Sequence, residues 1–319
     1  MHEIEYARAG VECRLRAPAK INLGLRLVGL RDDGYHLLES VFVPIDWSDR
    51  VHLRWQASGR LDVSLAVESG DSAQGVDAAT LPTGADNLVH RAALRFLQTA
   101  GRTGSLAITL SKNLPLGAGL GGGSSDAAAV LRGLSEILPG ACSASDCARL
   151  AVGIGADVPF FLDPRPAFVA GIGEQIEPLA WLPPLHLLLA NPGVPLATPA
   201  VFRAFDMLRS GATGDAAGAV RRALEGWRAS GTESPARRAA SLSRLLVNDL
   251  EPAALRLCPA IGRLLRRLSE LGATASGMSG SGATVYGVFE SESDARSAAE
   301  AFAPAAPGWV RAVVSGGAE

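Results

Sequence analysis

Hydrophobic and polar residues alternate along much of the first third of the chain, which predicts β-strands. Residues 11–16 and 21–28 form two such stretches, joined by Ala17, Pro18 and Ala19. The Asp-Gly pair in RDDGYH (31–36) is a hairpin signal, and 37–46 supplies the returning strand. Further strands are expected over 51–66 and 105–110, whereas 67–85 is rich in Gly, Ser and Asp and has no period.

Helical spacing of apolar residues begins at Asp86-Asn87 and runs to a glycine stop at Gly101. Because helices and strands follow in mixed order and not as regular βαβα units, the pattern predicts an α+β protein with two sub-domains. The other expected helices cover 145–152, 199–209, most of 210–271 with a loop around 229–235, and 291–303. The other expected strands cover 167–177, 185–190 and 308–314, and a glycine-serine loop at 273–289 leads into one more.

The stretch LPLGAGLGGGSSDAAAVL (114–131) places five glycines between Gly117 and Gly123, directly before helix-forming residues. Glycine is costly to order, so such a cluster indicates a backbone that needs φ > 0 or closely approaches another group. Ser124, Ser125 and Asp126 suit the start of the helix. A helix that begins behind a glycine loop directs free N–H groups and its positive dipole end at an anion, so the stretch predicts phosphate binding.

Other glycine-loop motifs fit less well. The GxGxxG spacing is present, but a dinucleotide site needs an acidic residue about twenty positions further on, and Cys142 stands there. A Walker A loop needs a Lys-Ser or Lys-Thr pair after the glycines. A flexible linker is a third interpretation, although a linker does not normally run directly into an apolar helix.

Composition narrows the class of protein. The chain of 319 residues has 48% hydrophobic and 19% charged residues and a net charge of −2, which suits one large or two medium domains and does not favour a nucleic-acid partner. The N-terminus MHEIEYARAG has no basic segment before an apolar one, so we expect a cytoplasmic protein without membrane contact. The four cysteines form no CxxC pair and the histidines no HxxxH pair, so no protein-held metal site is expected.

Lysine is unusually rare. Of thirty basic residues, Lys20 and Lys112 are the two lysines. Lysine presents a compact ammonium that acts as a point charge, whereas the arginine guanidinium is a wide planar fork. Each lysine is therefore a candidate for a role that arginine cannot fill, although chance retention of two lysines is the alternative.

Three motifs now stand together: PAKINLGLRL around Lys20, LPLGAGLGGGSSDAA, and SGMSGSGATVY near the C-terminus. They resemble the three motifs of the GHMP small-molecule kinases. The resemblance extends through DDGYHLLESVF, DNLVHRAA, GADVPFFL and NPGVPLATPAVF, and spans residues 17 to about 290. It implies a ribosomal protein S5 domain 2-like N-terminal domain, here 1–164, and a ferredoxin-like α/β C-terminal domain, here 165–319.

The resemblance also implies a reaction and assigns residues to it. The γ-phosphoryl group of ATP, with Mg²⁺ on its phosphates, would pass to a hydroxyl of a small-molecule substrate, in a monomer or weak homodimer. Asp157 and Lys20 match the catalytic positions: Asp157 would accept the hydroxyl proton while Lys20 helps to polarise the hydroxyl. The positions that match ATP contacts are Asn87, Lys112, Pro115, Gly117, Gly119, Leu120, Gly121, Gly122, Gly123, Ser124 and Ser125.

A further set matches contacts to a substrate that carries cytidine diphosphate. Tyr35 and Phe202 would stack on the cytosine ring and His36 would bond its edge, and the remaining matches are Asn22, Thr198, Gly280 and Ser281. Each residue also has a plain structural interpretation: Asp157 as a turn residue, Asn87 as a helix cap, Lys112 as a solvated strand end. The alternative functions are another GHMP kinase, of the mevalonate, homoserine or galactose type, a nucleotide-binding regulator without catalysis, and an oxidoreductase.

Overall fold

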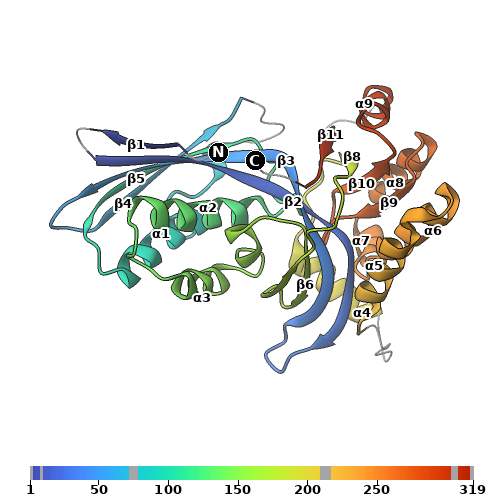
Figure 1. Cartoon of the computed structure of the whole chain (residues 1–319), viewed down its shortest axis with the longest axis horizontal. Helices are drawn as coiled ribbons and strands as arrows, with labels where there is room; N and C mark the ends of the chain where they lie inside the picture. The colour runs from blue at the N-terminus through green and yellow to red at the C-terminus, as the bar shows by residue number, and fades with distance from the viewer. Residues whose placement is uncertain (1–2, 8–9, 72–77, 209–216, 303–307, 317–319) are drawn as a thin grey trace.

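The computed structural model describes residues 3–7, 10–71, 78–208, 217–302 and 308–316. They form two β-sheets with helices packed against each, so the expected α+β class is confirmed (Figure 1). The first sheet and its helices lie at the left of Figure 1, and the second sheet and its helices lie at the right.

The first sheet has seven strands. Their order is β1-β2-β3-β5-β4, with β6 paired to β3 and β7 to β6. The β4–β5 pair is parallel, and every other pair in this sheet is antiparallel. The strands are β1 (Glu3–Ala7), β2 (Gly10–Leu30), β3 (His36–Ala57), β4 (Asp62–Ser69), β5 (Gly104–Lys112), β6 (Ala167–Gly171) and β7 (Gln175–Pro178).

Two strand predictions need correction. The segments 11–16 and 21–28 belong to one strand, β2, which continues through the expected linker with a register shift between Pro18 and Lys20. The irregularity accommodates the proline, which cannot donate to a regular ladder. The expected strand over 51–66 is divided between β3 and β4, because the chain turns after Ala57.

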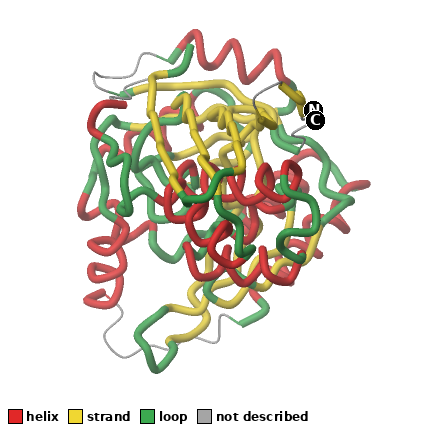
Figure 2. The backbone as a smooth tube through the Cα atoms, turned by 90° about the vertical axis from the view of Figure 1, so that its left-hand side faces the viewer, coloured by secondary structure: helices red, strands yellow, loops and turns green. Residues whose placement is uncertain are grey.

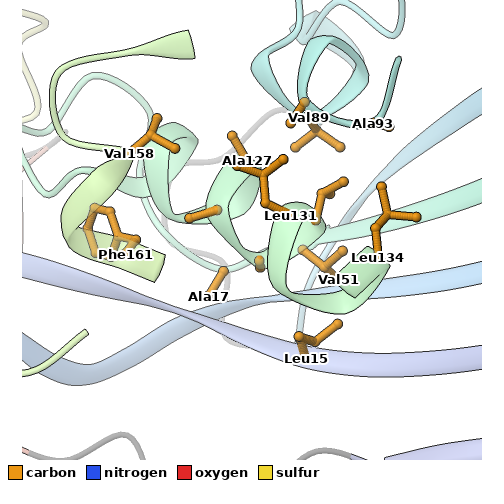
Figure 3. Packing of buried hydrophobic residues seen from close by; sticks show 14 of the residues in the cluster. Leu15, Ala17, Val51, Val89, Ala93, Ala127, Leu131, Leu134, Val158 and Phe161 are labelled. Carbon is orange, nitrogen blue, oxygen red and sulfur yellow. The ribbon is translucent and has the colours of Figure 1, made fainter. Parts of the chain in front are cut away.

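One face of the first sheet is covered by helices α1 (Leu88–Thr99), α2 (Gly122–Ile137) and α3 (Ala144–Ile154), with the 3₁₀ turn η2 (Pro159–Leu162) beside them. Alternate residues of the strands point toward these helices, as strand geometry requires. Figure 3 shows Leu15 and Val51 of the sheet beneath Leu131 and Leu134 of α2. Figure 2, which turns the left-hand side of Figure 1 toward the viewer, shows helices directly below the upper group of strands.

The second sheet has the order β11-β8-β10-β9 and is antiparallel throughout. Both of its faces are covered, which explains why β8 reads as an unbroken apolar run. Leu187 and Leu189 pack on one side with residues of β2 and β3, whereas Leu188 and Ala190 pack on the other with the C-terminal helices. The strands are β8 (His186–Asn191), β9 (Ala275–Met278), β10 (Val285–Phe289) and β11 (Trp309–Val314).

The helices of the second half follow the prediction closely. They are α4 (Thr198–Leu208), α5 (Ala219–Ala229), α6 (Pro235–Leu245), α7 (Glu251–Leu257), α8 (Ala260–Glu270) and α9 (Glu292–Ala301), with η3 (Ser230–Thr232) in the expected loop. Residues 209–216, part of the segment expected to be mostly helical, lie outside the described residues. The stretch 273–289, expected to be a loop before one strand, contains two strands, β9 and β10. Within the described ranges, no helix is long and apolar enough to cross a membrane.

The two halves share a continuous apolar cluster. It includes Ile21 of β2, Val43 of β3, Leu189 of β8 and Trp227 of α5. Although β6 and β7 follow the domain boundary expected at residue 164, both pair within the first sheet. Along the chain, the change from the first sheet to the second therefore falls between β7 and β8, and the boundary at 164 stays a prediction.

Leu131 tests the core beneath α2. Its side chain is fully buried among the sheet residues, so Leu131→Ala should lower the free energy of unfolding by about 2–5 kcal/mol. The exposed Met207 of α4 gives a control, since Met207→Ala should change it by less than about 0.5 kcal/mol. Urea unfolding followed by circular dichroism measures both, and equal midpoints for the two variants would contradict this account of the core.

Candidate active site

The glycine loop after β5 is a row of left-handed backbone positions. Gly117, Gly119 and Gly121 have φ values of 63°, 74° and 72°. Helix α2 begins at Gly122, two residues before the expected start, and Gly121 is its N-cap without a side-chain capping bond. Because the first N–H groups of a helix have no partner within it, those of Gly122 and Gly123 are available to an anion.

The two serines after the glycines differ. The backbone N–H of Ser125 donates to the Gly121 carbonyl, and its buried hydroxyl has no hydrogen-bond partner among the described residues. The expected phosphate contact of Ser125 stays a prediction. Ser124 is half-buried, and its Oγ lies 4.0 Å from the place that a Cβ on Gly155 would occupy. Its hydroxyl therefore lies beside the turn that carries Asp157.

The second glycine-serine loop lies against the first. Thr284 Oγ1 donates to the Ala118 carbonyl at 2.6 Å, and Ser279 Oγ donates to the Gly119 carbonyl at 3.3 Å. A Cβ on Gly119 would stand 2.9 Å from the Gly282 carbonyl oxygen, so the close approach requires glycine there. The two motifs, 160 residues apart in sequence, thus form one surface.

Lys20 and Asp157 meet next to this surface. Lys20 Nζ lies 3.4 Å from Asp157 Oδ2 and donates to Asn22 Oδ1 at 2.7 Å. The ammonium also lies 4.2 Å from the centroid of the Phe42 ring, and the Lys20 backbone N–H bonds the Leu120 carbonyl. The Lys20 side chain is 5% exposed and that of Asp157 33%. A fixed ammonium beside a reachable carboxylate can orient a hydroxyl and accept its proton.

Asn22 holds Lys20 in place. Its amide oxygen accepts from Lys20, its Nδ2 donates to Ser40 Oγ at 3.0 Å, and its backbone N–H donates to Ser279 Oγ. The hydroxyl of Tyr286, on β10, donates to the Asn22 backbone carbonyl at 2.8 Å. These bonds hold the buried Asn22 amide against Lys20, and the expected contact of Asn22 with a substrate stays a prediction.

Lys112 is paired with two buried carboxylates. Its Nζ donates to Asp49 Oδ2 and, at 2.8 Å, to Asp126 Oδ2. Asp49 Oδ1 also accepts the backbone N–H groups of Asn113 and Leu114. The interpretation of Lys112 as a solvated strand end is therefore wrong, because its side chain is 3% exposed.

Sequence reasoning missed Asp49 and Asp126. The pattern of apolar positions could have indicated that both are buried. Asp49 lies two residues before Val51, on the same core-facing side of β3, and Asp126 stands beside the buried alanines of α2. Burial raises the pKa of Asp126 to about 8; Lys112 opposes this shift and Asp49 adds to it. Burial lowers the pKa of Lys112, but the two carboxylates together raise it above its ordinary value.

A cavity of about 460 Å³ lies along the glycine loop and has the size of a small-molecule site. Asn87, at its edge, caps α1: its Oδ1 accepts from the Val89 N–H and its Nδ2 donates to the Pro82 carbonyl. The apolar side of the cavity would suit a planar base, while the loop N–H groups suit phosphates. The apolar lining residues are Leu81, Pro82, Leu88, Leu110, Pro115 and Leu116.

The residues predicted to hold a cytosine ring lie at the far end of the β2–β3 hairpin. The His36 ring is tilted against the Phe202 ring at a centroid distance of 5.0 Å, and His36 Nε2 lies 2.9 Å from Asp206 Oδ1 on α4. Tyr35 is 60% exposed at the tip of the hairpin. Sequence reasoning missed Asp206, which stands one helical turn after Phe202.

Thr198, Gly280 and Ser281 lie together near the second loop. Thr198 Oγ1 and Ser281 Oγ are 2.8 Å apart, and the Gly280 carbonyl accepts from Asn248 Nδ2 at 2.8 Å. The loop thus joins α4 to the segment after α6, and Thr198 is exposed beside it.

Comparison with known proteins agrees with this fold. The profile for the GHMP kinases N terminal domain matches residues 87–163, and the profile for GHMP kinases C terminal matches 216–306. These matches cover the glycine loop, Asp157 and the second glycine-serine loop, and they define the class of protein as a GHMP kinase.

Relatives within this class are more specific. The 4-diphosphocytidyl-2-C-methyl-D-erythritol kinase of Chelativorans sp. (strain BNC1) is 40% identical over 92% of each chain. That of Granulibacter bethesdensis is 44% identical over 89% of this chain and 87% of its own. A crystal structure of 4-(cytidine 5'-diphospho)-2C-methyl-D-erythritol kinase matches with a TM-score of 0.75 and 36% identity, over 95% of this chain and 99% of the other. The chain belongs to the family of the 4-diphosphocytidyl-2-C-methyl-D-erythritol kinases.

Asp126 predicts a pH dependence of stability. Because its pKa is raised to about 8 in the folded chain, the folded state retains a proton that the unfolded state loses at much lower pH, so stability falls as pH rises toward 8. One such group contributes a slope of up to about 1.4 kcal/mol per pH unit. Asp126→Asn should flatten the curve of urea-unfolding midpoint against pH between 6 and 9. Parallel curves for the wild-type chain and the variant would contradict the assignment.

Proposed function

We propose that this chain transfers the γ-phosphoryl group of ATP to the 2-hydroxyl of 4-diphosphocytidyl-2-C-methyl-D-erythritol, a step of the non-mevalonate route to isoprenoid precursors. The observation that carries the proposal is the Lys20–Asp157 pair at 3.4 Å, beside a glycine loop whose N–H groups face an open cavity. The proposal includes a cytoplasmic enzyme that is a monomer or a weak homodimer.

In this proposal the glycine loop binds the triphosphate. The unpaired N–H groups at the start of α2 and the dipole of that helix neutralise phosphate charge without a Walker lysine. The base would lie against the apolar wall near Asn87, where the cavity is bounded by Leu81 and Leu88. Phosphoryl transfer depends mainly on positioning and on charge stabilisation, and a rigid backbone cradle supplies both.

Mg²⁺ is part of the proposal as the partner of the ATP phosphates. Magnesium usually keeps several waters and takes one or two protein oxygens together with phosphate oxygens. The oxygens that fit this pattern are the Ser124 hydroxyl, beside the Gly155 turn, and the half-exposed Asp157 carboxylate. When bound, the ion would offset charge on the transferred phosphoryl group.

In the proposed reaction Asp157 accepts the proton of the attacking hydroxyl. Lys20 holds the Asp157 carboxylate and the substrate hydroxyl in place. Lys20 is held by Asn22, by the Phe42 ring and by its backbone bond to Leu120, so it links the acceptor site to the loop that grips the phosphates. In this proposal an alcohol bound at Lys20 and Asp157 would face the γ-phosphate of an ATP molecule held by the glycine loop, as an in-line transfer requires.

The length of the site supports the diphosphocytidyl substrate over smaller alcohols. Lys20 pairs with Pro44 in the middle of the β2–β3 ladder, whereas His36 pairs with Leu30 at its hairpin end. A molecule that reaches the Lys20–Asp157 pair and the His36–Phe202 rings together must be elongated. A cytidine joined through a diphosphate to a four-carbon alcohol has that shape, whereas mevalonate and homoserine do not.

A substrate comparison tests the proposal. With ATP and Mg²⁺, the purified chain should convert 4-diphosphocytidyl-2-C-methyl-D-erythritol to its 2-phosphate with formation of ADP, measured by phosphorus NMR. Mevalonate and homoserine should give no product above the background without enzyme. Phosphorylation of mevalonate but not of the cytidylyl alcohol would overturn the assigned substrate.

Lys20→Arg tests the catalytic pair. The ammonium is enclosed by Asn22, Asp157 and Phe42, so a wider guanidinium must displace them, and a misplacement of about 1 Å can lower turnover by about 100-fold. We expect that loss in kcat, with ATP affinity changed less than about threefold because the loop N–H groups remain. Steady-state kinetics and nucleotide titration measure the two quantities.

The control is the reverse exchange on the surface. Arg14→Lys replaces a half-exposed cation on the open face of the first sheet and should leave kcat within about twofold. Full activity of Lys20→Arg would show that Lys20 is a structural cation.

A further inference from the structure

Asp206 makes a contact that the catalytic proposal does not use. It lies on α4, and its Oδ1 is 2.9 Å from His36 Nε2. The His36 side chain is 13% exposed and that of Asp206 55%. The ring is also held by two aromatic neighbours, Phe202 at 5.0 Å and Phe205 at 5.9 Å between centroids. The imidazole is therefore fixed in position, with the carboxylate on its outer edge.

A carboxylate determines which ring nitrogen of a neutral histidine carries the proton. An ionised carboxylate only accepts hydrogen bonds, so the nitrogen that faces it, Nε2, must be the donor. In the neutral ring Nδ1 is then left with a lone pair and can only accept. Nδ1 is bonded to Cγ, so it lies on the side of the ring nearer to the His36 backbone.

An acceptor at this place distinguishes the two common pyrimidines. Cytosine carries an amino group where uracil carries a carbonyl oxygen, so an acceptor bonds the first and repels the second. A site that hydrogen-bonds one group discriminates strongly against an analogue that leaves its polar atom unpaired. The tautomer of His36 therefore decides which base this end of the site accepts.

We propose that Asp206 is a positioning residue that fixes His36 as the Nε2–H tautomer, and that the resulting Nδ1 acceptor selects a cytosine nucleotide over a uracil nucleotide. The inference rests on the proposed function, because that function places the base at His36. The inference adds Asp206 to the residues of the proposed site and gives a physical basis for the choice of base. Asp206 does not touch the reacting atoms, so its effect falls on binding and not on transfer.

The test compares binding of CDP and UDP to the full chain by calorimetry. The wild-type chain should bind CDP at least about tenfold more tightly than UDP, as one well-formed hydrogen bond allows. In Asp206→Asn the amide can present either its oxygen or its NH₂ to the ring, so both tautomers are accessible. The CDP to UDP ratio should then fall below about threefold, through weaker CDP binding and stronger UDP binding.

Two further measurements distinguish a positioning role of Asp206 from a purely structural role. Long-range ¹H–¹⁵N spectra should show His36 as the Nε2–H form in the wild-type chain and as a mixture in Asp206→Asn, with His36→Gln identifying the signals. With the cytidylyl substrate, Asp206→Asn should raise KM while kcat stays within about twofold. Asp163→Asn, which removes an exposed carboxylate paired with Arg165, is the matched control and should change neither the ratio nor KM.

The outcomes distinguish this inference from the proposed function. A wild-type preference for CDP that survives unchanged in Asp206→Asn, or a His36 tautomer that does not depend on Asp206, would overturn the inference alone. A wild-type chain that phosphorylates the cytidylyl alcohol but binds CDP and UDP equally would also overturn it. A wild-type chain that neither binds CDP nor phosphorylates that alcohol would overturn the proposed function, and the inference with it.

Discussion

The buried ammonium of Lys112 connects three segments whose relative positions shape the glycine loop. Asp49 belongs to β3, Lys112 ends β5, and Asp126 lies in the second turn of α2. Burying the Lys112 charge costs free energy that its partners recover, and removal of one partner of a buried ion pair typically costs about 3–5 kcal/mol. The glycine loop connects Lys112, the last residue of β5, to α2, so this network holds the elements on both sides of the loop and thereby the direction of the N–H groups at the start of α2.

Strand β2 brings the two halves of the chain to one point. Its first part belongs to the core under the N-terminal helices, and its later part to the cluster shared with the second sheet. Lys20 lies where the two meet, with Leu120 of the glycine loop on one side and Asn22 on the other. Because Ser279 and Tyr286 of the C-terminal half bond Asn22, which in turn bonds Lys20, residues of both halves hold Lys20 in place.

The proposed function gives the site two ends with different physical demands. At the end with Lys20 and Asp157, a fixed charge and a backbone cradle serve a reaction in which phosphate charge must be neutralised. At the hairpin end, His36 and Phe202 provide a ring surface and a polar edge for a base. Separating recognition from transfer in this way lets a long substrate be selected by its base without altering the groups around the reacting hydroxyl.

The sequence alone determined the α+β class, most helices and strands, and the glycine loop that leads into a helix, because glycine clusters, alternation and caps are local signals. It did not reveal the continuity of β2, since a proline inside a strand reads locally as a break. It also did not reveal that Asp49 and Asp126 enclose Lys112, or that Asp206 faces His36, 170 residues away. Those pairings join residues far apart in the chain, and only the tertiary structure decided them, because the free energy of a buried charge or of a histidine tautomer depends on partners that no local pattern identifies.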